Sequence, residues 1–106
     1  MTTALLKKIF LILITIVFTT PVLSDDKMDL GLEVFNNKAT CGTCHVLKTA
    51  GSTGNIGPDL DQLKPSMERI IYAVKNGIGV MQAWEGILTS EEIEAVAYYV
   101  FNSTNK

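Results

Sequence analysis

One short stretch of the chain contains residue types that could do redox chemistry, Cys41-Gly42-Thr43-Cys44-His45. Two thiols separated by two residues can form thioether bonds to the two vinyl groups of a haem, and the histidine that follows can ligate its iron from one side. Cys41 and Cys44 are the only cysteines of the chain, and His45 is its only histidine. The stretch therefore predicts the attachment of one c-type haem.

The same residues permit two other interpretations. A Cys41–Cys44 disulfide would use the same pair, but a redox motif of the thioredoxin type usually lies in a βαβ unit, and the sequence shows no strand pattern. A structural zinc site needs four ligands. Cys41, Cys44 and His45 supply three, and the chain has no further cysteine or histidine to complete the site. Haem attachment explains the spacing more completely than either alternative.

A haem ligated by His45 would leave the other face of its iron open, bound to water or occupied by a second residue. Methionine is the candidate, because no second histidine exists and a thioether is a soft ligand suited to haem iron. Met28 and Met67 lie in predicted helices, whereas Met81 lies in an apolar segment with glycines, residues 77–84, that could fold over the haem. We expect Met81 to be the second ligand, with Met67 or an open site as the alternatives. Core filling is the ordinary role of a methionine.

The first helix that must position the motif is predicted from residue 26 to about residue 38. Asp26 is placed to cap its N-terminus, and apolar residues recur at helical spacing along one face. These residues are Met28, Leu32 and Phe35. Gly31 inside this helix costs about 1 kcal/mol relative to alanine, and a common reason for such a glycine is that another backbone passes close to it.

Two further helices are predicted after the motif. Pro65 stands in the first turn of the second helix, which ends at Asn76-Gly77. Thr89 and Glu92 form a capping box at the start of the last helix. Residues 49–59 lie between the motif and these helices, and their glycines and small polar residues predict a loop. The expected fold class is therefore all-α.

The end of this loop, Gly57-Pro58-Asp59-Leu60, permits two interpretations. It is either part of a flexible surface connection or a rigid turn after which Leu60 packs against the haem. In the second case a carbonyl of the turn could accept a hydrogen bond from the ring nitrogen of His45 that does not ligate iron. The sequence alone leaves both interpretations open.

Residues 1–24 have the pattern of a secretory signal peptide. Lys7-Lys8 precedes an apolar run over residues 9–18, and Val22-Leu23-Ser24 provides a small residue at the cleavage point. The run is shorter than the roughly 20 residues that span a bilayer. Cleavage after Ser24 is therefore predicted in preference to a retained anchor, which leaves residues 25–106 as one domain without stable membrane insertion.

The 82 residues that remain of the 106 would have only a marginal hydrophobic core. A covalently attached haem would enlarge that core and act as a cross-link. The segment carries seven basic and eleven acidic side chains, which gives a net charge of −4. It contains no basic run or basic patch interleaved with aromatic residues, so no nucleic-acid partner is predicted.

Over residues 28–102 the chain resembles the small class I cytochromes c of bacterial periplasmic type. The residues that carry the resemblance are Gly31, Phe35, Cys41, Cys44, His45, Gly57, Pro58, Leu60, Met81 and Tyr99. It implies three main helices and loops wrapped around one covalent haem c, with the first and last helices crossing closely at Gly31. It also implies His45 and Met81 as axial ligands and the Pro58 carbonyl as the acceptor for His45. One departure is Gln82, which stands where many relatives have proline.

The resemblance implies a periplasmic one-electron carrier rather than an enzyme, because haem c is attached outside the bacterial cytoplasm and two axial ligands leave substrate no place on the iron. Its partners are redox proteins whose identity the sequence does not specify, and the chain is expected to be a monomer or a subunit of a heteromer. Several apolar residues are predicted to keep water from the haem, with plain core packing as the alternative for Trp84. These residues are Ile56, Leu60, Ile71, Val80 and Trp84.

Residues 76–100 are similar both to soluble bacterial and photosynthetic cytochromes and to the haem subunits of periplasmic sulfite dehydrogenases. The alternative function is therefore a dedicated haem subunit of a larger periplasmic oxidoreductase. A peroxidase would need an open iron position and a distal acid-base group, and a ligand sensor would need an output domain in addition. The chain has no second histidine to serve as the acid-base group of a peroxidase, and the predicted mature segment is too short to include the output domain of a sensor.

Overall fold

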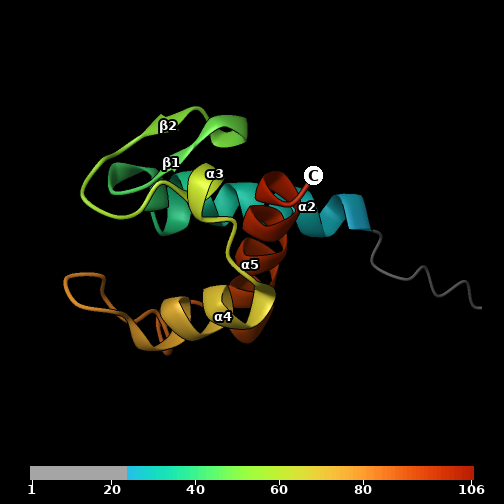
Figure 1. Ribbon diagram of the computed structural model, residues 1–106. Helices are drawn as coiled ribbons and strands as arrows, with labels where there is room; N and C mark the ends of the chain where they lie inside the picture. The colour runs from blue at the N-terminus through green and yellow to red at the C-terminus, as the bar shows by residue number, and fades with distance from the viewer. Residues whose placement is uncertain (1–23) are drawn as a thin grey trace, which may run out of the picture.

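The computed structural model describes residues 24–106, which form a mostly helical domain (Figure 1). Its longer helices are α2 (Ser24–Glu33), α4 (Met67–Asn76) and α5 (Ser90–Thr104). The shorter elements are a π-helical turn (Val34–Lys38), 3-10 turns (Cys41–Thr43 and Lys48–Ala50), strands β1 (Val46–Leu47) and β2 (Ser52–Thr53), and helix α3 (Leu60–Leu63). The all-α prediction is confirmed. The proposed signal peptide lies outside the described residues except for Ser24, which begins α2.

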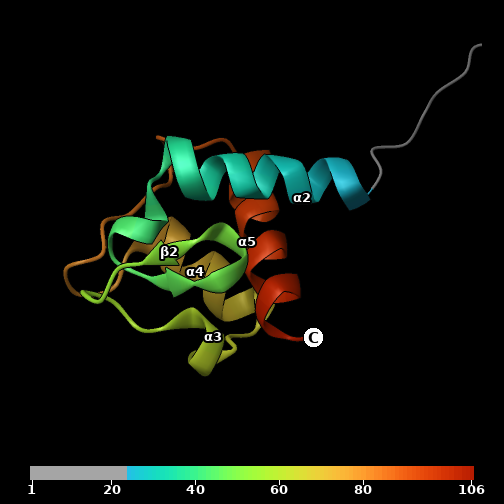
Figure 2. The same cartoon turned by 90° about the horizontal axis from the view of Figure 1, so that it is seen from above.

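Helices α2 and α5 cross one another, and α4 packs against α5 on the other side of the domain (Figures 1 and 2). The crossing is direct at Gly31, where an added Cβ would lie 2.3 Å from the carbonyl oxygen of Ala95 and 2.4 Å from the Cβ of Tyr99. Real Cβ atoms do not approach other atoms so closely. Glycine at this position therefore allows the two backbones to touch, as the sequence predicted.

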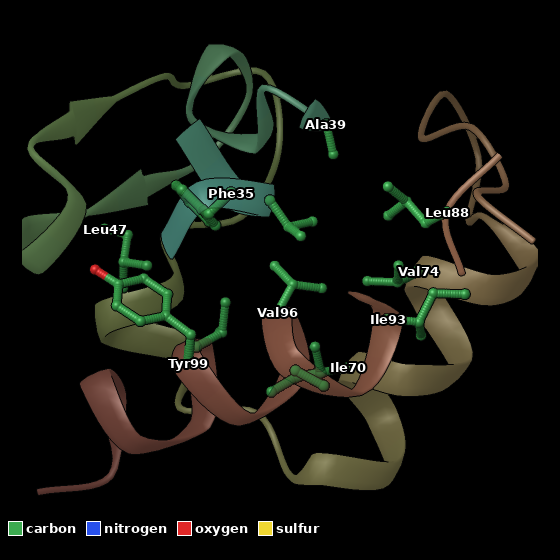
Figure 3. Packing of buried hydrophobic residues seen from close by; sticks show 12 residues of the cluster. Phe35, Ala39, Leu47, Ile70, Val74, Leu88, Ile93, Val96 and Tyr99 are labelled. Carbon is green, nitrogen blue, oxygen red and sulfur yellow. The ribbon is translucent and has the colours of Figure 1, made fainter. Parts of the chain in front are cut away.

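The core lies around this crossing and continues between α4 and α5 (Figure 3). Its largest fully buried side chains are Phe35, Leu47, Val34 and Val96. The rings of Phe35 and Tyr99 pack at a tilt of 55° with their centroids 6.2 Å apart, a favourable arrangement for an aromatic pair. The hydroxyl of Tyr99 also shares a 2.8 Å hydrogen bond with that of Thr49, which ties α5 to the segment that follows His45.

The capping box of α5 is present as predicted. The Thr89 hydroxyl accepts a hydrogen bond from the Glu92 N–H at 3.1 Å, and the Glu92 carboxylate accepts one from the Thr89 N–H at 3.0 Å. The predicted end of α4 is also confirmed, because Gly77 follows its last residue with a φ of 72°. Within residues 24–106, no helix combines the length and apolar character needed to cross a membrane.

Two predicted helix starts are wrong. Helix α2 already begins at Ser24, so Asp26 lies in its first turn, where a carboxylate is favoured by the helix dipole. Pro65 lies before α4 instead of inside it, because the Ser66 hydroxyl caps this helix by accepting from the Arg69 N–H at 3.3 Å. A serine hydroxyl can satisfy a free N–H of the first turn, which proline at that position cannot do.

The loop predicted over residues 49–59 is partly ordered. It includes β2, which pairs antiparallel with β1 so that Val46 faces Thr53 and Leu47 faces Ser52. Each strand has only two residues, so no alternation of apolar and polar residues could indicate it. The expectation that the chain has no strands is therefore corrected by one small hairpin beside the Cys41–His45 motif.

Replacing Gly31 by alanine is expected to lower the free energy of unfolding by about 2 kcal/mol. The new methyl group would force α2 away from α5, and overpacking of this type costs about 1–3 kcal/mol even though alanine is the better helix former. Denaturant unfolding followed by circular dichroism measures the change. Asp29→Ala on the exposed side of the same helix is the control, and equal stability of the two variants would contradict the direct crossing.

Candidate haem site

The Cys41–His45 motif folds as a tight turn at the end of the segment that leaves α2. The N–H groups of Cys44 and His45 both donate to the carbonyl of Cys41, at 3.1 and 3.0 Å. Thr40 enters this turn with a φ of 48°, a left-handed conformation that costs a β-branched residue roughly 1–2 kcal/mol. The surrounding contacts must therefore hold the turn in place against local strain.

Both thiols of the motif are free and partly buried, so the structure does not contain the disulfide that the sequence left as an alternative. Burial raises the pKa of the Cys41 thiol to about 11. Among residues 24–106, no three histidine, cysteine, aspartate or glutamate side chains are grouped so that they could hold a metal ion. Two free thiols followed by a histidine are the donor set that covalent haem attachment requires.

The ring of His45 is fixed by the turn at residues 57–60. Its Nδ1 lies 2.7 Å from the carbonyl oxygen of Pro58. Because a carbonyl only accepts hydrogen bonds, Nδ1 carries the proton, and Nε2 keeps the lone pair that a metal needs. Gly57 lies against the ring, since a Cβ there would come within 2.6 Å of the His45 Cε1. The carbonyl hydrogen bond of the second interpretation is therefore present, whereas the packing of Leu60 against the haem stays a prediction.

The turn continues into α3, where two aspartates hold the backbone. The Asp59 carboxylate caps α3 by accepting from the N–H groups of Asp61 and Gln62, at 2.9 and 3.3 Å. The Asp61 carboxylate accepts from the N–H of Lys48 at 2.9 Å. Leu60 is the first residue of α3 and packs, partly buried, against the core. The turn is therefore anchored both to α3 and to the segment after His45.

Met81 lies in a loop that is bound to the end of α4 by backbone hydrogen bonds. Met81 and Ile78 exchange two of them, at 2.9 and 3.2 Å, and the Trp84 N–H donates to the Val74 carbonyl at 2.8 Å. A Cβ at Gly77 would lie 2.4 Å from the Met81 carbonyl oxygen, so only glycine permits this packing. The loop is thus anchored although residue 82 is glutamine and not the more rigid proline.

The structure brings Cys41, Cys44, His45 and Pro58 together through these hydrogen bonds, whereas Met81 comes from a separate segment. That segment and the hairpin next to the motif extend to the same side of α5 (Figures 1 and 2). Met81 is partly buried against the core.

The other residues considered from the sequence fall into two groups. Met28, Met67, Leu60, Ile71 and Trp84 are partly buried against the core. Ile56 and Val80 expose 66% and 91% of their surface in the polypeptide.

Two hydrogen bonds to residues 45–48 were not predicted from the sequence. The Ser52 hydroxyl donates to the carbonyl of His45 at 2.9 Å, and Asp61 binds the backbone of Lys48 as described. Both join residues that lie in different local elements, so no local pattern marks them. The one sequence feature that could have suggested the Asp61 contact is the position of Asp61 in the first turn of a helix that another aspartate, Asp59, caps.

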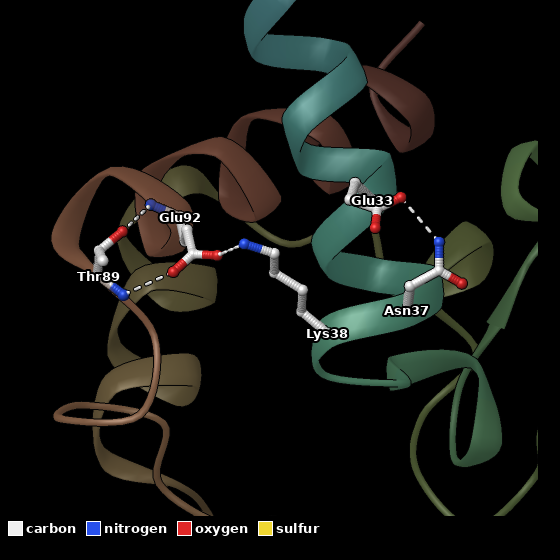
Figure 4. A network of polar contacts seen from close by, with 5 residues as sticks. All are labelled: Glu33, Asn37, Lys38, Thr89 and Glu92. Atoms are coloured by element: carbon white, nitrogen blue, oxygen red, sulfur yellow. Dashed lines mark hydrogen bonds and ion pairs between the residues drawn. The ribbon is translucent and has the colours of Figure 1, made fainter.

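An ion pair joins the segment before the motif to the start of α5 (Figure 4). The Lys38 ammonium donates to the same Glu92 carboxylate that completes the capping box. This hydrogen bond raises the pKa of Lys38 above its ordinary value of 10.5. The hydrogen bond from Lys38, together with that from the Thr89 N–H, lowers the pKa of Glu92 below its ordinary value of 4.5. On the neighbouring turn, the Asn37 amide donates to Glu33 at 2.7 Å.

Comparisons with known proteins identify the family of the chain. A family model described as cytochrome C oxidase, cbb3-type, subunit III, matches residues 26–100. The chain is 37% identical over 87 residues to cytochrome c6 of Tetradesmus obliquus, which covers 73% of this chain and 93% of that protein. It is 37% identical over 99 residues to the chloroplastic cytochrome c6 of Chlamydomonas reinhardtii, covering 82% of this chain and 63% of that protein.

Among solved structures, the chain is similar to the c-type cytochrome SorU from Sinorhizobium meliloti. The sequences are 50% identical, the TM-score is 0.71, and the match covers 77% of this chain and 95% of the other. The protein belongs to the small monohaem class I c-type cytochromes, as the sequence predicted. Its cofactor is covalently bound haem c, and it is an electron-transfer protein that works with redox partners.

Replacing Lys38 by methionine is expected to lower the urea midpoint slightly at pH 7. Because the pKa of Glu92 is lowered on folding, the ion pair contributes stability above the ordinary pKa of that carboxyl and loses it as the pH falls through the lowered pKa. Because the pKa of Lys38 is raised, the contribution also disappears as the pH rises through that raised pKa. The difference from the wild type should therefore be steady from about pH 5 to about pH 10 and shrink on either side.

Urea unfolding of both proteins as a function of pH measures this difference. Lys75→Met is the matched control, because Lys75 and Glu85 are exposed and their charged groups are 4.0 Å apart. This control should show a smaller difference at every pH. If the difference in urea midpoint between Lys38→Met and the wild type does not change with pH below pH 4, the ion pair does not contribute to stability.

Proposed function

We propose that this cytochrome is a periplasmic one-electron carrier whose haem c is attached to Cys41 and Cys44 and ligated by His45 and Met81. The observation that carries the proposal is the hydrogen bond from the Nδ1–H of His45 to Pro58 at 2.7 Å. It leaves Nε2 as the ligating nitrogen and makes the imidazole a stronger electron donor. The free thiols of Cys41 and Cys44 lie in the same tight turn.

The haem supplies the change between Fe(III) and Fe(II), and the residues of the chain set the conditions for it. His45, in an orientation fixed by Pro58 and Gly57, would hold the iron. Met81 would supply a thioether as the second ligand, which favours the reduced state and raises the reduction potential. With both residues bound, no substrate would reach the iron, and the group would supply one-electron transfer alone.

The periplasmic location is supported by the signal-peptide pattern of residues 1–24 and by the requirement that haem c be attached outside the bacterial cytoplasm. The partners are proposed to be redox proteins with basic docking surfaces, because residues 25–106 carry a net charge of −4. Association steered by opposite charges slows as salt screens them. Partner kinetics that do not change between low and high salt would reject this docking mode.

A second candidate function is a dedicated haem subunit of a larger periplasmic oxidoreductase. It is favoured by the exposed apolar side chains in and next to the Met81 loop, because apolar groups gathered on a surface often mark a protein contact. These are Ile78 and Ile87. Recovery of the native protein in a stable complex of fixed composition would favour the subunit, whereas recovery as a monomer favours the carrier.

Replacing Met81 by alanine is expected to remove the weak near-infrared band of a methionine-ligated ferric haem and to lower the reduction potential. The loss of the band should be complete, because alanine has no atom that can bind iron. Absorption spectra of the oxidised and reduced proteins, with a redox titration, measure both effects.

Met67→Leu is the matched control for this experiment, because it removes a thioether that packs against the core at the start of α4. The control should keep the band and change the potential little. If Met81→Ala keeps the band and Met67→Leu loses it, Met67 is the ligand. A wild-type spectrum that is high-spin and shifts with carbon monoxide would show an open site.

A further inference from the structure

Three hydrogen bonds join the segment that contains His45 to the segment that contains Pro58. The Gly57 N–H donates to the Cys44 carbonyl at 2.7 Å, the His45 Nδ1–H donates to the Pro58 carbonyl at 2.7 Å, and the Lys48 N–H donates to the Asp61 carboxylate at 2.9 Å. The last two each join residues 13 positions apart, and the first has the same spacing. Residues 44–48 and 57–61 therefore lie side by side in one register.

Asp61 makes the contact at the end of this register. The other two bonds use backbone atoms and the histidine itself, so among the hydrogen bonds that join these two segments within residues 24–106, only that of Asp61 uses a side chain outside the proposed iron ligands. Its own N–H donates to the Asp59 carboxylate at 2.9 Å, which fixes the chain directly after Pro58. A displacement of Asp61 would therefore also displace the Pro58 carbonyl, because only a short, hydrogen-bonded stretch of chain separates them.

We propose that Asp61 is a positioning residue for His45. Its carboxylate holds residues 57–61 in register with residues 44–48 and so keeps the Pro58 carbonyl in line with the Nδ1–H. An acceptor at Nδ1 makes the imidazole a better donor to iron, and a better donor stabilises Fe(III). A loosened register weakens this donation and shifts the reduction equilibrium toward Fe(II). The inference rests on the proposed ligation of iron by His45.

Substitutions at Asp61 separate this positioning effect from the effect of its charge. Asp61→Asn removes the charge but keeps a side-chain oxygen that can accept from Lys48. Asp61→Ala removes both the charge and the acceptor. Asp61→Glu keeps the charge but moves the oxygens by one methylene group. Any change in reduction potential or proton exchange that the asparagine and alanine variants share is electrostatic. The additional change in the alanine variant measures the loss of the hydrogen bond that holds the two segments in register.

The experiment uses the haem-loaded protein and two readouts. The first is the exchange rate of the His45 Nδ1 proton in the reduced, diamagnetic state, measured by nuclear magnetic resonance. The second is the reduction potential. Relative to the asparagine variant, the alanine variant should exchange this proton about fivefold faster, the factor that corresponds to the net contribution of one hydrogen bond. It should also have the higher potential.

The glutamate variant keeps the test decisive if the alanine variant does not fold, because it should also exchange faster than the wild type although its charge is unchanged. Equal exchange rates in the wild type and in the folded glutamate, asparagine and alanine variants would overturn the proposal. Failure of the proposed function would look different. The wild type would then lack the ring-current-shifted signals of an iron-bound His45, whereas failure of this inference leaves them in place in every variant.

Discussion

The domain depends on the direct contact of α2 and α5 at Gly31. Helix α2 leads into the turn that carries Cys41, and α5 supports the core between that turn and α4. The two proposed iron ligands come from different parts of the chain, and both are placed relative to α5. The His45 side is tied to it through the Thr49–Tyr99 hydrogen bond, and the Met81 side is tied to it through α4. A shift at the crossing would therefore move one ligand relative to the other.

Around His45, the chain uses backbone atoms and few side chains. Ring orientation comes from one carbonyl at Pro58 and from the absence of a side chain at Gly57. The strained Thr40 at the entrance of the turn shows that this arrangement is imposed by its surroundings. The ion pair of Lys38 with Glu92 and the Ser52 contact to the His45 carbonyl hold the turn from two sides. A rigid site of this type would limit the rearrangement that accompanies a change in the charge of an iron ligated by His45.

The sequence predicted those features that depend on local residue patterns. The Cys41–His45 motif, the capping box at Thr89 and the end of α4 at Gly77 are each set by residues within a few positions, and the structure contains them. The start of α4 was misplaced because Pro65 and Ser66 both fit a helix start, and only the hydrogen bond of Ser66 decides between them. Contacts over long sequence separations leave no local pattern, and the Lys38–Glu92 pair spans 54 positions.

The most direct test of covalent attachment through the motif is mass spectrometry of tryptic peptides from the purified protein after acid-acetone extraction. Trypsin cleaves after Lys38 and Lys48, so Cys41, Cys44 and His45 fall on one peptide, residues 39–48. The account predicts that haem resists the extraction and that this peptide carries the mass of one haem with no free thiol. Extraction of the haem together with recovery of an unmodified peptide 39–48 would contradict it.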